Sequence, residues 1–152
     1  MDNALADWSI VPVSVPFENF HEFKADAESE NYEFVDVLIG DWQDGSEDFS
    51  EPGARFLGLA LDGKIVGVGG LGHDQHFPDQ QIGRIKHVYV LKDYRRRGIA
   101  RLLALALMQD AEKSFGTIRL HAASANAARL YEELGFEPID HPTATHIKQL
   151  IR

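Results

Sequence analysis

The chain has 152 residues, 44% of them hydrophobic, which is enough to form one domain (residues 1–152) around its own core. It contains no cysteine, which excludes disulfides, thiolate metal ligands and cysteine nucleophiles. The net charge of −9 disfavours nucleic acid as a partner. No apolar run has the length of a membrane span or the pattern of a signal segment, so we expect a cytoplasmic protein.

The first third of the sequence predicts one strand and two helices. Residues 8–15 alternate apolar and polar side chains, which is the period of a half-buried strand. Phenylalanines at threefold spacing predict a helix over residues 17–28. Residues 32–39 favour a second helix, although their residue types suit a strand nearly as well, and the acidic, turn-rich stretch 41–53 is expected to be a loop.

The middle of the sequence predicts three strands. Residues 55–61 and 64–71 are apolar runs joined by Asp62-Gly63, a strong hairpin signal. Residues 74–81 contain a proline and are expected to be a loop, and 82–91 is the third strand.

The last third predicts two more helices within a mixed sheet. Residues 99–115 are rich in Leu and Ala, and Gly116 is expected to close this helix at its C′ position. The remaining elements are a strand, a helix and two strands: 117–122, 125–134, 136–139 and 146–150. The fold class is therefore α/β (α+β), with one mixed, mostly antiparallel central sheet of about six or seven strands flanked by helices.

A basic turn lies between the third strand of the middle region and the long helix. It reads Arg95-Arg96-Arg97-Gly98-Ile99-Ala100 and lies within residues 84–101, which carry seven Lys and Arg against one Asp. The first turn of a helix leaves backbone N–H groups unpaired at its partly positive end, and Gly98 has no Cβ to keep a phosphate away. The turn is either a pyrophosphate-binding loop for a nucleotide-bearing cofactor or an ordinary exposed basic turn.

Two other ligand motifs are not supported. Residues 67–72 match the dinucleotide-binding spacing Gly-x-Gly-x-x-Gly, but no helical pattern follows them. We interpret them as strand glycines that allow close packing or leave room for a ligand. His73 and His76 have neither a helix to align them nor a further ligand cluster, so no metal site is predicted, and His146 is expected at an alternating, exposed strand position.

Three segments in register carry a resemblance to a known family. Arg95-x-x-Gly98-x-Ala100 fits the Arg/Gln-x-x-Gly-x-Gly/Ala signature of the GNAT superfamily of N-acetyltransferases. Val88-Tyr89-Val90 looks like that family's fourth strand, and residues 130–136 (LYEELGF) resemble its "LYexLGF" segment. The resemblance covers roughly residues 55–150. It implies the acyl-CoA N-acyltransferase fold, acetyl-CoA as co-substrate and transfer of the acetyl group to a primary amine by direct attack in a ternary complex.

The resemblance also implies a cofactor site. Backbone amides of residues 96–101 would hold the pyrophosphate, and backbone groups of Val88 and Val90 would pair with the pantetheine arm. Many members have Asn where this chain has Ser124; Ser124 and Asn126 would either replace it or cap the following helix. The implied cofactor-binding residues are Val88, Val90, Arg95, Arg96, Arg97, Gly98, Ile99, Ala100, Arg101, Ser124 and Asn126.

Tyr131 matches the family's usual general acid, and a phenol with a reference pKa of ~10 stays protonated at neutral pH. Its alternative role is core packing. Lys86 stands where some members place a glutamate base, and an ordinary lysine is a poor base. His87, on the same strand, is therefore a possible base.

The acceptor is expected to be a small-molecule amine or a peptide or protein amine, and the acidity of the chain favours a cationic small molecule. A homodimer is possible. The alternative function is a non-catalytic CoA-binding or regulatory domain of the same fold; a nucleic-acid binder that uses the basic patch of residues 84–101 is a weaker one.

Overall fold

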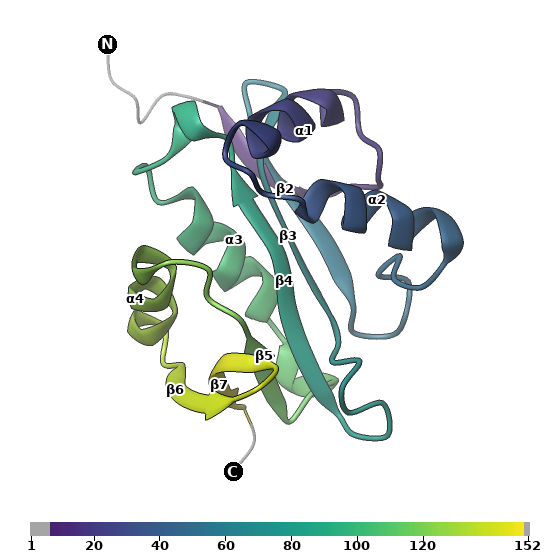
Figure 1. The fold of residues 1–152 in the computed structure, drawn as a ribbon, viewed down its shortest axis with the longest axis vertical. Coiled ribbons are helices and arrows are strands. Elements are labelled where there is room, and N and C mark those ends of the chain that lie inside the picture. Colours follow the sequence, from purple (N-terminus) through teal and green to yellow (C-terminus); the bar gives the residue numbers. More distant parts are fainter. Residues whose placement is uncertain (1–6, 151–152) are drawn as a thin grey trace.

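The computed structural model describes residues 7–150 (Figure 1). These residues form four α-helices and seven strands. Their bounds are β1 (Trp8–Pro12), α1 (Phe20–Ser29), α2 (Phe34–Asp44), β2 (Arg55–Leu61), β3 (Lys64–His73), β4 (Ile82–Val90), the 3-10 helix η2 (Lys92–Tyr94), α3 (Ile99–Met108), the 3-10 helix η3 (Ala111–Lys113), β5 (Thr117–Leu120), α4 (Ala125–Glu133), β6 (Glu137–His141) and β7 (Ala144–Gln149).

The strands form one sheet in the order β1-β2-β3-β4-β5-β7-β6. Only the β4–β5 pair is parallel; the other neighbours are antiparallel. The predicted mixed, mostly antiparallel sheet is thus confirmed. Asp62 and Gly63 both have positive φ, 50° and 84°, as the predicted two-residue hairpin turn between β2 and β3 requires.

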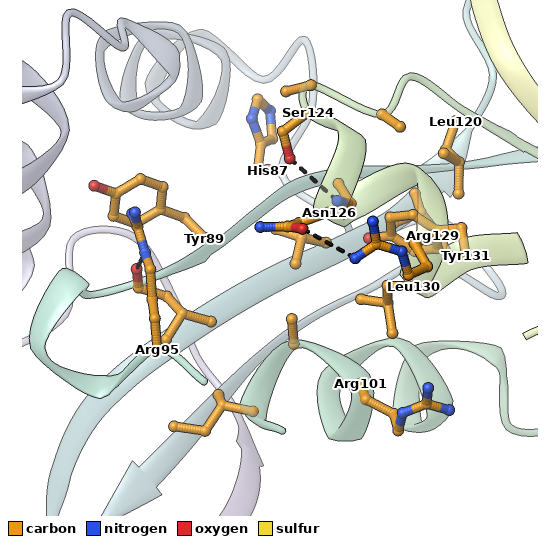
Figure 2. Close-up of a pocket in the computed structure, with 18 of the residues that line it drawn as sticks. His87, Tyr89, Arg95, Arg101, Leu120, Ser124, Asn126, Arg129, Leu130 and Tyr131 are labelled. Atoms are coloured by element: carbon orange, nitrogen blue, oxygen red, sulfur yellow. Dashed lines mark hydrogen bonds between the residues drawn. The ribbon is translucent and has the colours of Figure 1, made fainter. Parts of the chain in front are cut away.

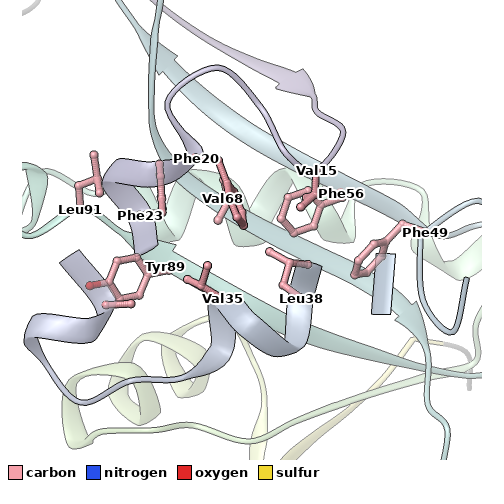
Figure 3. Close-up of a cluster of buried hydrophobic side chains, with 11 residues drawn as sticks. Val15, Phe20, Phe23, Val35, Leu38, Phe49, Phe56, Val68, Tyr89 and Leu91 are labelled. Atoms are coloured by element: carbon pink, nitrogen blue, oxygen red, sulfur yellow. The ribbon is translucent and has the colours of Figure 1, made fainter. Parts of the chain in front are cut away.

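Helices cover both faces of the sheet, α1 and α2 on one side and α3 and α4 on the other (Figure 1). The core under α1 and α2 is largely aromatic, and Phe23, Phe56 and Tyr89 belong to it (Figure 3). The core under α3 is mainly aliphatic, with Leu107 and Ile118 fully buried. β4 contributes side chains to both cores, so it lies at the centre of the molecule.

The glycines of residues 67–72 lie inside β3, as predicted, and allow other elements to approach closely. A Cβ on Gly67 would stand 2.9 Å from Cγ2 of Ile99, so only glycine lets the start of α3 pack this tightly on the sheet. Among residues 7–150, no helix is long and apolar enough to cross a membrane.

The predicted helix over residues 99–115 is wrong in its length. α3 ends at Met108, because Gln109 is extended and Asp110 is left-handed, with φ of 61°. The chain must turn back here so that Phe115 can pack against β4 under Gly83. Gly116 therefore does not cap α3, and the Leu- and Ala-rich pattern predicted a helix that tertiary packing interrupts.

Several other boundaries also differ from the predictions. The helix predicted over residues 17–28 is α1 (Phe20–Ser29), and the strand predicted over 117–122 is β5, which ends at Leu120. The first strand stops at Pro12 instead of residue 15, and the second helix is α2, shifted to Phe34–Asp44, so it takes in the start of the predicted 41–53 loop. The last two strands, β6 and β7, meet in a short turn, so they start or end up to two residues away from the predicted bounds.

Candidate active site

β4 and β5 separate in the middle of the sheet. Their parallel pairing ends at Ile85 and Leu120, and beyond this point β4 has no β5 partner. At the same place the β3–β4 register shifts by one residue, which marks a β-bulge, and His87 takes a left-handed φ of 61°. The bulge bends β4 away from β5 and opens the sheet.

A cleft of about 1180 Å³ fills this opening (Figure 2). β4 and the loop before α3 form one wall, α4 and the β5–α4 connection form the other, and Glu30 and Tyr32 lie at its edge. All the predicted site residues except Arg97 line it. The guanidinium of Arg97 instead lies 5.1 Å from the centre of the Tyr94 ring, outside the cleft.

The backbone of β4 presents hydrogen-bonding groups to this cleft. The N–H of Leu91 donates to the carbonyl of Val66 on the β3 side, at 2.9 Å. Backbone groups of successive strand residues point to opposite edges, so those of Val88 and Val90 point toward the cleft. An extended ligand could therefore pair with β4 as an additional strand, in the place that β5 has left.

The first turn of α3 has the geometry of an anion site. Gly98 is the N-cap residue with a left-handed φ of 79°, Arg96 is left-handed at 66°, and no side chain caps the helix. The N–H groups that open α3 are thus available at the positive end of the helix dipole. A Cβ on Gly98 would meet no atom within 4 Å, so the space in front of the turn is open.

Arg95 holds the loop in place rather than facing the cleft with a free charge. Its two terminal nitrogens each donate to Glu30, which follows the last residue of α1, at 2.9 Å, and its Nε donates to the carbonyl of Val90 at 2.9 Å. The Tyr89 hydroxyl also donates to Glu30, at 2.9 Å. Hydrogen bonds from Arg95 lower the pKa of Glu30 from 4.5 to about 2.

Tyr131 packs in the core and also borders the cleft. Its ring is buried against Phe136, with centroids 5.6 Å apart, and it also lines the cleft. Burial raises the pKa of Tyr131 well above its usual value of 10.0, and nearby Tyr32 raises it further. The hydroxyl therefore stays protonated throughout the physiological pH range.

His87 lies at the bulge with its ring stacked on Phe34, centroid to centroid 5.9 Å. Burial lowers the pKa of His87 from 6.5 to about 4, with a further contribution from the positive charge of Lys86. The imidazole is therefore neutral at pH 7. Lys86 forms an ion pair with Glu47, 2.8 Å away.

Ser124 is the N-cap residue of α4. Its hydroxyl accepts a hydrogen bond from the N–H of Ala127 at 3.1 Å. Asn126 accepts from Arg129 at 3.2 Å, and all three polar side chains line the cleft. Arg129, Glu30 and Tyr32 were not predicted as site residues. Arg129 belongs to a predicted helix next to Tyr131, whereas nothing local marks Glu30 or Tyr32.

A buried polar network ties α4 to the sheet. The prediction that His146 is exposed is wrong, because this side chain is buried on β7. Its Nε2 lies 2.9 Å from a carboxylate oxygen of Glu132, and its Nδ1 lies 2.8 Å from the Thr145 hydroxyl. Thr145 in turn accepts the N–H of Ala122, at 2.8 Å. The helix that carries Tyr131 and the connection before it are thus fixed by one network.

No group of three or more His, Asp or Glu side chains that could hold a metal ion occurs within residues 7–150. The cleft's polar lining combines arginines and hydroxyls, which suit a phosphate-bearing organic ligand, with the carboxylates of Glu30 and Glu133 and the rings of His87 and His121.

Comparison with known proteins agrees with this architecture. Residues 17–136 match the acetyltransferase (GNAT) family. A curated relative, the uncharacterized N-acetyltransferase YjgM of Escherichia coli (strain K12), is 33% identical over 96 residues, which are 61% of this chain and 57% of that protein. The chain thus matches little more than half the length of this relative.

Two solved structures share the fold. A crystal structure from Exiguobacterium sp. 255-15, assigned as an acetyltransferase, superposes with a TM-score of 0.83 at 24% identity, over 94% of this chain and 93% of that one. The ribosomal-protein-S18-alanine N-acetyltransferase of Escherichia coli superposes with a TM-score of 0.69 at 16% identity, over 96% of each chain. With the family match covering most of its length, the chain belongs to the acetyltransferase (GNAT) family.

Proposed function

We propose that this protein is an acetyl-CoA-dependent N-acetyltransferase that acts on a primary amine by direct attack in a ternary complex. The observation that carries the proposal is the cleft, because it brings an anion-binding helix turn, an unpaired strand edge and Tyr131 around one space. Its volume of about 1180 Å³ exceeds the ~300–1,000 Å³ of an ordinary small-ligand pocket, as a ligand of the length of CoA requires.

The residues present fit such a ligand. The N–H groups of residues 96–101 would hold the pyrophosphate, and the backbone of Val88 and Val90 would bind the pantetheine arm. The side chains of Arg96, Arg101 and Arg129 also line the cleft. When bound, acetyl-CoA supplies a thioester whose carbonyl carbon an amine can attack.

Tyr131 and His87 would handle the two protons of the reaction. The Tyr131 hydroxyl, kept protonated by burial, would donate to the sulfur as the C–S bond breaks. The neutral His87 ring would accept a proton from the amine nitrogen as the new N–C bond makes that nitrogen acidic. A histidine with a pKa of about 4 is a weak base, so it would act only on this activated nitrogen.

The acceptor would enter from the face of the sheet opposite α3. The helix turn that binds the pyrophosphate lies with α3 and α4 on one face, whereas Tyr32 and Lys86 reach the cleft from the face of α1 and α2. This face is made of loops and side chains far apart in sequence. The amine could belong to a small molecule or to a peptide or protein.

Release of CoA thiol from acetyl-CoA in the presence of a panel of amines tests the proposal. We expect turnover with at least one amine, and we expect Tyr131→Phe to lower kcat at least ~10-fold with little change in CoA affinity. Tyr94→Phe, outside the cleft, is the matched control. Tight CoA binding without turnover on any amine would favour a non-catalytic CoA-binding domain, and an unchanged kcat would remove Tyr131 from the mechanism.

A further inference from the structure

A buried cluster of charged side chains lies beside the cleft, near the ends of β4 and β5 that are lowest in Figure 1. Arg84 on β4 and Arg119 on β5 are direct partners in the parallel ladder, one position before its last pair. That last pair, Ile85 and Leu120, points into the core under α3. The two arginines therefore project from the opposite face, the one from which an amine would enter.

The positive charge of this cluster is not balanced. Among residues 7–150, Asp74, fully buried after β3, is the one carboxylate that pairs with both guanidiniums. Its Oδ2 lies 3.5 Å from Nη1 of Arg84 and 3.5 Å from Nε of Arg119. Both distances exceed the ~2.7–2.9 Å of a good charge-assisted hydrogen bond. Lys86 does not alter the balance, because Glu47 pairs with it.

Arg119 is 3% exposed, and its Nε and Nη1 have no hydrogen-bond acceptor among residues 7–150. Its Nη2 donates to the Thr143 hydroxyl and lies 3.5 Å from Nδ1 of His141. The Phe77 ring stacks on the guanidinium with its centre 4.7 Å from the central carbon. Stacking covers a face of the group but leaves its edge for an in-plane acceptor. Buried polar N–H groups almost always have such an acceptor, so Arg119 is prepared for one.

We propose that Arg119 and Arg84 form an anion subsite that recognises a carboxylate on the amine acceptor; the inference rests on the proposed acetyl transfer. His87 lies three residues beyond Arg84 on β4, at most roughly 10 Å along the strand at ~3.3 Å per residue, because the bulge at His87 shortens the rise. The carboxylate and the reacting nitrogen are thus at opposite ends of the acceptor, as in a small ω-amino acid.

Access to the subsite is through Arg84. The Arg84 side chain is 18% exposed, whereas the unpaired nitrogens of Arg119 are sealed from solvent. A carboxylate would therefore meet Arg84 first. It would reach Arg119 when the connection between β3 and β4, which carries Phe77, moves aside.

Acetylation of 6-aminohexanoate and of hexylamine, which lacks the carboxylate, tests the subsite. We expect a KM for 6-aminohexanoate at least ~10-fold below that for hexylamine. Arg119→Met should raise the KM for 6-aminohexanoate by roughly 10- to 100-fold and leave that for hexylamine unchanged, because a hydrogen bond to a charged group is lost. Lys113→Met, on exposed η3, removes a positive charge elsewhere and should change neither KM.

Arg119→Met removes one partner of the buried Asp74 and so lowers stability. The double variant Asp74→Asn/Arg119→Met removes both charges and separates this effect from binding. It should show the same change in KM. In the wild-type protein, hexanoate should inhibit in competition with the amine and not with acetyl-CoA. Equal KM values for the two amines, with no inhibition by hexanoate, would overturn the subsite and leave the proposed function standing.

If no amine is acetylated, the proposed function fails and hexanoate binding alone decides on the subsite. A rise in the wild-type melting temperature with hexanoate that the double variant lacks would support the subsite. No rise would overturn it.

Discussion

The ion pair between Glu30 and Arg95 predicts a stability that depends on pH. Arg95 lowers the pKa of Glu30 from 4.5 to about 2, which at ~1.4 kcal/mol per pKa step corresponds to no more than about 4 kcal/mol. The side chains are 32% and 39% exposed, so solvent screening reduces the free energy to about 1–2 kcal/mol. Glu30→Gln keeps the shape and removes the charge, and it should lower the unfolding free energy at pH 7 by that amount.

Urea unfolding measures this loss, and the melting temperature should fall by ~2–8 °C. Because folding lowers the pKa of Glu30, its contribution is complete above pH 4.5 and is lost as the pH falls toward 2. The stability of the variant should lack this part of the pH dependence. Its CoA affinity should also fall, since Arg95 would no longer hold the loop before α3 against α1.

Glu28→Gln is the matched control, because Glu28 lies in the last turn of α1 next to Glu30, is exposed and, among residues 7–150, forms an ion pair only with Lys24, at 3.4 Å. If Glu30→Gln and Glu28→Gln unfold at the same urea concentration at pH 7, the ion pair contributes nothing to stability. Arg95 would then not be the cause of a lowered pKa of Glu30.

Two further variants and a pH profile test other parts of the site. Gly98→Val should weaken CoA binding at least ~10-fold. The control Gly45→Val strains a comparable left-handed residue outside the cleft, so it should lower stability by a similar amount and leave CoA affinity unchanged. Equal CoA affinities of the two variants would refute the assignment of the loop before α3 as the pyrophosphate site. If His87 is the base, kcat at saturating amine should stay level from pH 7 down to about 4, and a fall centred near 6.5 would contradict its lowered pKa. His146→Leu should remove the partner of Glu132 and raise the KM for acetyl-CoA in steady-state kinetics. The control Lys113→Met should leave this KM unchanged.

The parts of the site that could be predicted are those encoded locally. The turn around Gly98 and the helix with Tyr131 each follow from a short motif, because their backbone geometry depends on neighbouring residues. The partner of Arg95 lies 65 residues earlier, just after α1, and no pattern near either residue links them. His146 alternates correctly for a strand, but its burial depends on α4 covering that face.

The errors in the fold have the same origin. Helical propensity continues past Met108, yet α3 stops there because Phe115 is needed under the sheet. The order of elements and the mixed sheet were predicted correctly, since apolar periodicity along the chain determines both.

The bulge at His87 also changes which side of the sheet each later residue faces. Before it, Ile85 belongs to the core under α3; after it, Val88 packs against that same core and Tyr89 against the one under α1. In an uninterrupted strand Val88 and Tyr89 would exchange faces, because side chains alternate with a period of two. Removing the bulge without shortening the chain would therefore turn a polar tyrosine toward the aliphatic core. Regular pairing of β4 would close the cleft, but it would also exchange the side chains that β4 contributes to the two hydrophobic cores. The packing of these two cores therefore keeps the cleft open.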